Sequence, residues 1–197
     1  MRRAAGQHRP QQAIPPARTV GPAIPVGTIT IVAGDAAGAE EGNRDRAVSA
    51  PDVATAAAEV LRREGVELLP AYPLNPLIES AAAAGIRPVI VRQERVGVHM
   101  ADALSRLTDG VGVFCMQAGP GVENSFGAVA QAFSEGVPLV VVPGGSPRAQ
   151  GWVPPAFNAA LNFRHVTKAT EQVTTGAGLV PALRRAFTQA RNGRPGP

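Results

Sequence analysis

The sequence is poor in cysteine, aromatic residues and long apolar runs, and each shortage excludes a class of protein. Its 197 residues include one cysteine, Cys115, which excludes an internal disulfide framework and a cysteine-based zinc site. That shortage also fits a reducing, cytoplasmic compartment. Aromatic residues make up 4% of the chain, so a core has to be built from Ala, Val, Leu and Ile. No apolar run approaches the ~20 residues of a membrane span, so we expect no membrane association.

Lysine is almost absent too, although the net charge is +4. Lys168 is the only lysine, and the arginines are scattered rather than grouped in a stripe. Too few aromatic residues accompany them to act as stacking platforms, so we expect no nucleic-acid partner. The length suits one sizeable domain.

The chain divides into two parts by composition. Residues 1–50 are rich in Ala, Gly, Pro and Arg and show no sustained period, apart from a possible strand at Thr28–Val32. We expect 1–50 to be a disordered or poorly ordered N-terminal extension, or translation from an upstream start codon, rather than a transit peptide. Residues 51–197 are expected to form the domain.

From Pro51 onward, short apolar runs alternate with helical patterns. Asp52 is a plausible N-cap for the first helix and Gly65 a plausible stop. The patterns predict helices over 53–63, 74–84, 94–107, 122–133 and 177–191, and strands over 66–71, 88–91, 111–116 and 138–142.

The predicted strands are apolar on both faces, as parallel strands covered by helices must be. The fold class is therefore α/β, a three-layer domain with a parallel sheet flanked by helices. Ligands bind such sheets at the carboxyl ends of the strands. Three segments are expected there: Tyr72–Pro76, Arg92–Arg95 and Gln117–Asn124.

Two of these segments could carry chemistry. In Gln117–Asn124, glycines permit close backbone approach, and amides at a helix start favour an anion or a polar ring. The segment lacks the Gly-Lys-Ser/Thr of a phosphate-binding loop and the spacing of a dinucleotide fingerprint. An ordinary strand-to-helix turn is the alternative. Glu94 follows a strand directly; it is either functional or a solvated carboxylate that complements the helix dipole.

Other reactive side chains are interpreted as structural. His99 and Asp102 can share a helix face, but no further ligand has suitable spacing, so no metal site is expected within this chain. Cys115 is expected to be an inert core residue. Ser125 lacks the small-residue elbow of a hydrolase nucleophile. Trp152, in a Pro/Gly-rich loop, could cap a pocket or simply pack.

Taken together, the motifs resemble the N-terminal, pyrimidine-binding domain of thiamine diphosphate enzymes of the acetolactate synthase type. Arg92–Arg95 with Val98–Ala103 and Arg106 resembles their "RHEQ…HAADGYAR" stretch, and Gly119–Asn124 resembles "GPGxxN". Tyr72-Pro73 resembles "YPG", and Val137–Val142 resembles the strand after "S(I/V)P". Phe157-Asn158 resembles "FQE", Thr167-Lys168 resembles "(V/I)TK", and Gly193–Pro197 resembles "GRPGPV". The match runs in register from about 52 to 197.

The resemblance implies a function and a set of site residues. In that family the glutamate aligned with Glu94 is catalytic: it bonds to N1′ of the cofactor aminopyrimidine and activates the cofactor for attack on a 2-keto acid. Asn124 could also buttress the loop without touching the cofactor. The implied cofactor-binding residues are Pro73, Glu94, Gly119, Pro120, Gly121 and Asn124; the implied substrate-proximal ones are Gln117 and Asn158.

This sequence departs from the family pattern at three places. Leu74-Asn75 replaces Gly-Gly after the first strand, and Asn158 stands where a glutamine is frequent. Ala103–Arg106 lacks the usual Gly before Tyr-Ala-Arg. The resemblance therefore implies the broader class of 2-keto acid enzymes more than acetolactate synthase itself.

The family also binds the cofactor diphosphate through Mg²⁺, at a "GDG…NN" motif in a later domain that this sequence lacks. We therefore expect a truncated piece, inactive alone, that needs a second subunit or chain, with a homodimer or tetramer as the full enzyme. FAD is possible but not indicated. The alternatives are a separate small subunit of a split 2-keto acid decarboxylase and a non-catalytic α/β binding module.

Overall fold

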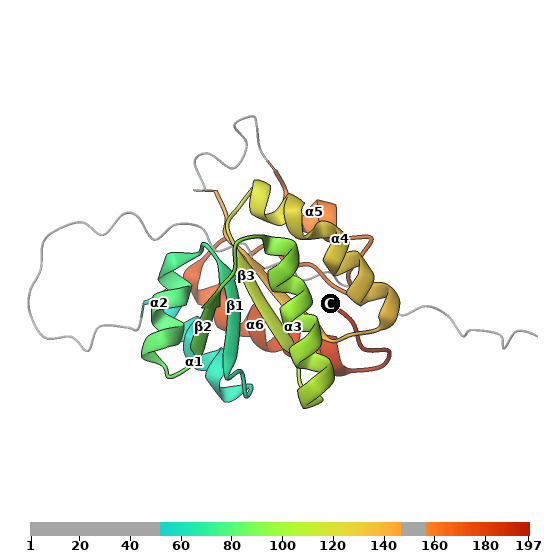
Figure 1. Cartoon of the computed structure of the whole chain (residues 1–197). Helices are drawn as coiled ribbons and strands as arrows, with labels where there is room; N and C mark the ends of the chain where they lie inside the picture. Colours follow the sequence, from blue (N-terminus) through green and yellow to red (C-terminus); the bar gives the residue numbers. More distant parts are fainter. Residues whose placement is uncertain (1–51, 147–156) are drawn as a thin grey trace, which may run out of the picture.

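A computed structural model describes residues 52–146 and 157–197 and contains one parallel sheet between two layers of helices (Figure 1). The strands are β1 (Leu68–Tyr72), β2 (Arg87–Ile90), β3 (Gly112–Met116) and β4 (Leu139–Pro143), in the order β2-β1-β3-β4. The helices are α1 (Val53–Arg63), α2 (Asn75–Ala83), α3 (Glu94–Thr108), α4 (Pro120–Glu135), α5 (Ala159–Phe163) and α6 (Gly176–Arg191). All three strand pairs are parallel, which confirms the predicted fold class.

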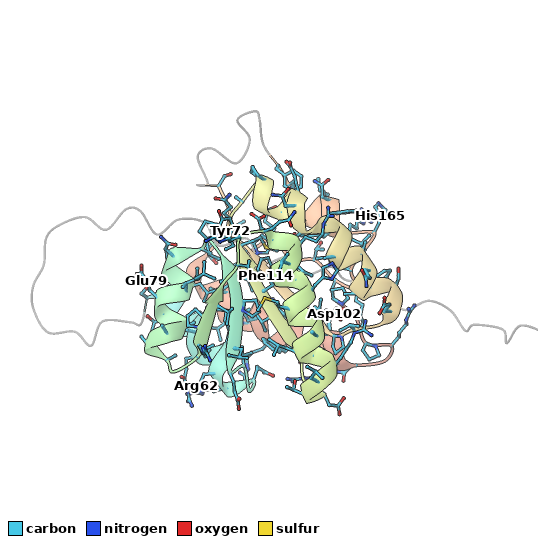
Figure 2. All side chains as sticks on the ribbon, in the orientation of Figure 1. Arg62, Tyr72, Glu79, Asp102, Phe114 and His165 are labelled. Atoms are coloured by element: carbon cyan, nitrogen blue, oxygen red, sulfur yellow. The ribbon has the colours of Figure 1, made fainter. Side chains whose placement is uncertain are left out.

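Each face of the sheet has its own core because the side chains of the strands alternate. Val113 and Cys115 of β3 point into a cluster shared with α1, α2 and α6. Phe114 and Met116 point the other way, into a cluster shared with α3, α4 and α5. Figure 1 shows α3 in front of the sheet and α6 behind it, and Figure 2 shows Phe114 between α3 and the sheet. The twofold period of the strand thus builds both layers.

Local signals fix where the helices begin and end. The Asp52 carboxylate accepts a hydrogen bond from the amide of Ala54 at 3.1 Å, so the predicted N-cap is confirmed. Gly65 follows α1 with a φ of 85°. Helix α4 starts at Pro120 and not at Val122, because proline suits the first helical turn.

Helix α5 was not predicted. It is short and begins at Asn158, whose side chain accepts from the amide of Leu161 at 3.0 Å. Five residues give too little periodicity to be recognised in a sequence. The proposed extension 1–50, with its strand at Thr28–Val32, and Trp152 lie outside the described residues.

The C-terminal motifs of the sequence meet in space. The backbone amide of Lys168 donates to the carbonyl of Pro197 at 2.6 Å. Its Nζ donates to the carbonyl of Asn192 at 2.6 Å and also to that of Gln189. The one lysine therefore holds the last residues and the end of α6 together.

The strand order places a topological switch point between β1 and β3. The chain leaves β1 towards β2 on one side, then crosses back to β3 on the other, so the connections after β1 and β3 run apart. Ligand sites in open α/β sheets lie outside the carboxyl ends of strands at such a reversal. Tyr72 marks this end in Figure 2, and its carbonyl accepts from the amide of Gln117 at 3.2 Å.

Candidate cofactor site

Glu94 is a buried carboxylate at the carboxyl end of the sheet. It is the first residue of α3 and only 3% exposed. The side-chain amide of Asn124, on α4, donates to its Oε2 at 3.1 Å. Among the described residues, no group donates to Oε1. Buried oxygens without a partner are rare in folded proteins, so Oε1 marks a position where a ligand can supply a donor.

The close approach of α3 to β3 explains why Glu94 is buried. Gly97 lies one turn into α3, and a Cβ atom there would come within 2.1 Å of Cε2 of Phe114. Glycine therefore lets the start of the helix lie directly on the sheet. The positive end of the helix dipole also favours a negative charge at Glu94. The alternative interpretation of Glu94 as a solvated carboxylate is wrong, because its side chain is buried.

The Gly119–Asn124 turn forms the opposite wall of the site. Gly119 precedes α4 with a φ of 67°, a conformation that L side chains rarely adopt. Gly121 is buried, and a Cβ on it would lie 2.9 Å from Cγ of Gln117 and 3.3 Å from Oε1 of Glu94. A residue with any side chain would crowd the carboxylate.

The structure brings some of the predicted site residues together. Glu94, Gly121 and Asn124 are neighbours, and Gln117 touches the same turn. Pro73 follows Tyr72 at the end of β1, and Pro120 is the first residue of α4; both are exposed. Pro73, Gly119 and Pro120 lie at this end of the sheet. Their contacts with the cofactor remain predictions.

Asn158 belongs to a neighbouring hollow of about 60 Å³ and has no hydrogen bond to Glu94. Its side-chain oxygen is engaged as the cap of α5, which reduces what it can offer to a substrate. The hollow is lined by Gly119, Phe157, Asn158 and several residues that were not predicted from the sequence: Gly144, Gly145, Ser146 and Gln172. The first three follow β4, so the strand-end rule, applied to a fourth strand, would have found them.

Among the side chains interpreted as structural, Asp102 and Ser125 have structural partners. Asp102 accepts from Nε of Arg106 at 2.6 Å, and Arg106 also pairs with Glu135, which ties α3 to α4. His99 is exposed and makes no hydrogen bond to Asp102. Ser125 donates to the carbonyl of Val122 at 2.7 Å.

Within 52–146 and 157–197, no group of three or more His, Cys, Asp or Glu side chains is placed to hold a metal ion. No helix of those ranges is long and apolar enough to cross a membrane.

These features define a class: a three-layer α/β domain with a buried carboxylate and a Gly-Pro-Gly helix start at the carboxyl end of its sheet. The family model described as "Thiamine pyrophosphate enzyme, N-terminal TPP binding domain" matches residues 51–152. The chain belongs to this family, so the resemblance stated from the motifs is confirmed.

Curated relatives agree with this assignment. The chain is 34% identical over 146 residues to 2-hydroxyacyl-CoA lyase 2 of Danio rerio, covering 71% of this chain and 23% of that protein. It is 32% identical over 148 residues to the acetolactate synthase large subunit of Haemophilus influenzae, covering 70% and 25%. It is 34% identical over 142 residues to the acetolactate synthase isozyme 3 large subunit of Escherichia coli, covering 68% and 24%. The chain thus spans about a quarter of the length of these relatives.

Proposed function

We propose that this chain is the pyrimidine-binding part of a thiamine diphosphate enzyme that decarboxylates or joins 2-keto acids, with Glu94 as its main catalytic residue. The observation that carries the proposal is the buried Glu94 carboxylate, whose Oε1 accepts no hydrogen bond within the described ranges. A buried acceptor beside a helix start fits a ring nitrogen that shares a proton. The acetolactate synthase relatives support the substrate class.

The residues of the chain divide the work between binding and proton transfer. Oε1 of Glu94 holds or releases the proton at N1′ of the aminopyrimidine. Because Gly121 has no side chain, the start of α4 leaves space beside that oxygen. When bound, thiamine diphosphate supplies an electron sink for the electron pair released when a 2-keto acid loses CO₂.

A second domain completes the proposed enzyme. The family resemblance and the quarter-length coverage of the relatives support a partner that holds Mg²⁺ and the diphosphate. We infer that this partner is another subunit in a homodimer or tetramer, and that the chain alone is inactive. The cytoplasmic location that we propose rests on the single cysteine, which fits a reducing compartment.

The decisive experiment compares the wild type with Glu94→Gln in the enzyme assembled with its diphosphate-binding partner. We expect Glu94→Gln to lower the turnover of pyruvate or another 2-keto acid by about 100-fold or more, because a general acid–base group contributes that much. Glu79→Gln is the matched control: Glu79 is an exposed carboxylate on α2, in the other helix layer. Near-normal turnover by Glu94→Gln would show that the assigned role is wrong.

A further inference from the structure

We propose that Asn124 is a positioning residue that makes the two oxygens of Glu94 unequal, so that Oε1 alone is offered to the cofactor. This inference rests on the proposed function of Glu94. It also replaces the direct cofactor contact expected of Asn124 from the family resemblance with an indirect role.

The hydrogen bond itself selects one oxygen. Nδ2 of Asn124 lies 3.1 Å from Oε2 of Glu94 and can only donate. The reverse orientation would set the amide oxygen against a carboxylate oxygen, which is repulsive when the acid is ionised. A donor to a charged acceptor makes a stronger bond than a neutral pair. Oε2 is therefore engaged before any ligand arrives.

The opposite oxygen faces a residue on the same helix. Gly121 and Asn124 are three positions apart on α4 and so lie on one face of it. Oε1 lies 3.3 Å from the point where a Cβ on Gly121 would sit, while Asn124 donates to Oε2. This face of α4 therefore leaves Oε1 of Glu94 without a hydrogen bond and engages Oε2 through Asn124.

Orientation matters because the carboxylate would otherwise turn. The last torsion of a glutamate is broad and roughly twofold, so both oxygens of an unrestrained group exchange places. Asn124 and Glu94 lie on different helices, 30 residues apart, that pack against each other. A restraint from a second rigid element holds the acid in one geometry, which is what a preorganised site requires.

The hydrogen bond is tested first in the 197-residue chain by NMR of the Asn124 side-chain amide. We expect its two protons to be well separated in the wild type and to move towards random-coil positions in Glu94→Ala. The control Glu79→Gln should leave them in place, because Glu79 lies on α2 in the other helix layer. An Asn124 amide that ignores Glu94→Ala would overturn the inference.

The role is tested by a double-mutant cycle in the assembled enzyme, with titration of thiamine diphosphate followed by fluorescence and with the kcat and KM of the 2-keto acid. We expect Asn124→Ala to weaken cofactor affinity or lower kcat by about tenfold to 100-fold, with little change in KM. In the Glu94→Gln background, the same change should have almost no further effect.

The outcomes separate the two proposals. A full effect of Asn124→Ala in the Glu94→Gln background would mean that Asn124 contacts the cofactor itself, and would overturn the positioning role. No effect of Asn124→Ala in the wild-type background would do the same. If the Glu94→Gln enzyme turns over its substrate at a normal rate, the proposed function is wrong. The NMR experiment tests the Asn124–Glu94 hydrogen bond separately.

Discussion

Oε1 of Glu94 lies 3.3 Å from the point where a Cβ atom on Gly121 would sit. That separation is tighter than most contacts of a real Cβ, so the start of α4 lies close to the carboxylate. The glycine is required by the closeness of Gln117 and Glu94, since a Cβ would lie 2.9 Å from Cγ of Gln117, and not by an unusual backbone angle. The two glycines of the Gly-Pro-Gly turn therefore differ in purpose: Gly119 adopts a positive φ, and Gly121 avoids a clash with its neighbours.

Adding one methyl group at this contact should weaken cofactor binding. We expect Gly121→Ala to lower the affinity for thiamine diphosphate by about tenfold, because the new Cβ displaces the carboxylate or Gln117, at a cost of about 1–3 kcal/mol for overpacking. Affinity is measured by calorimetric titration of the assembled enzyme.

Gly127, on the same helix, provides the matched control. A Cβ there meets nothing within 4 Å. Gly127→Ala should leave cofactor affinity unchanged and raise the free energy of unfolding by about 0.5–1 kcal/mol, through helix propensity alone. Equal affinities for Gly121→Ala and Gly127→Ala would contradict the crowding argument.

Much of the fold could be predicted because it depends on local and periodic signals. The Asp52 cap and the alternation of Val113, Phe114, Cys115 and Met116 can be recognised without knowing what packs against them. Parallel pairing followed from strands that are apolar on both faces. Element ends shifted by a few residues where caps and a proline decided them, as at Pro120.

The site could be predicted only in part, because contacts between helices are not written in any short segment. The position of Glu94 after a strand was visible in the sequence, but its burial depends on Gly97 meeting Phe114. Nothing local indicates that Asn124 binds Glu94, 30 residues away. The role of Asn158 as a helix cap was hidden because α5 was too short to be recognised.

The contact between α3 and β3 should be intolerant of added volume. A Cβ on Gly97 would lie 2.1 Å from Cε2 of Phe114, so Gly97→Ala should lower the free energy of unfolding by about 1–3 kcal/mol despite the better helix propensity of alanine. Chemical denaturation with urea measures the change.

A second substitution tests the cause. Phe114→Leu removes the opposing ring atoms, so the pair Gly97→Ala with Phe114→Leu should lose less stability than the two single changes predict when added. Additive losses would show that the ring of Phe114 is not what excludes a side chain at residue 97.

Burial should make Cys115 unreactive and pH-sensitive. Burial raises the pKa of its thiol from an ordinary value near 9.0 to about 12. Between these values the unfolded chain loses a proton that the folded chain keeps, so the free energy of unfolding should fall as pH rises from 9.0 towards 12, by about 1.4 kcal/mol per pH unit.

The comparison uses Cys115→Ala, in which this part of the pH slope should vanish. Ellman's reagent should also react with the wild type only after denaturation. Rapid reaction of the native thiol at pH 8 would contradict its burial.

The ion pairs of Arg106 should stabilise the packing of α3 on α4. Arg106→Gln removes a partner from Asp102 and from Glu135, so we expect a lower melting temperature at pH 7. Arg106 lowers the pKa of the Glu135 carboxylate, so its contribution is present above the ordinary glutamate pKa and is lost as pH falls through the lowered one.

The difference between the wild type and Arg106→Gln should therefore shrink in acid and in high salt. Arg184→Gln is the control, since Arg184 is exposed and its guanidinium makes no ion pair within the described ranges. A melting-temperature difference that persists at pH 2 would mean that Arg106 acts through packing and not through charge.

The separation of the two cores by the sheet has a consequence for how the domain can change. Glu94, Gly121 and Asn124 all belong to the layer of α3 and α4, whereas α1, α2 and α6 fill the other side. We expect the far layer to accept repacking and stabilising substitutions with little effect on the site, because the strands screen one side from the other. Sequence drift and protein engineering can therefore adjust stability in the far half of the molecule while the half that holds Glu94 stays fixed.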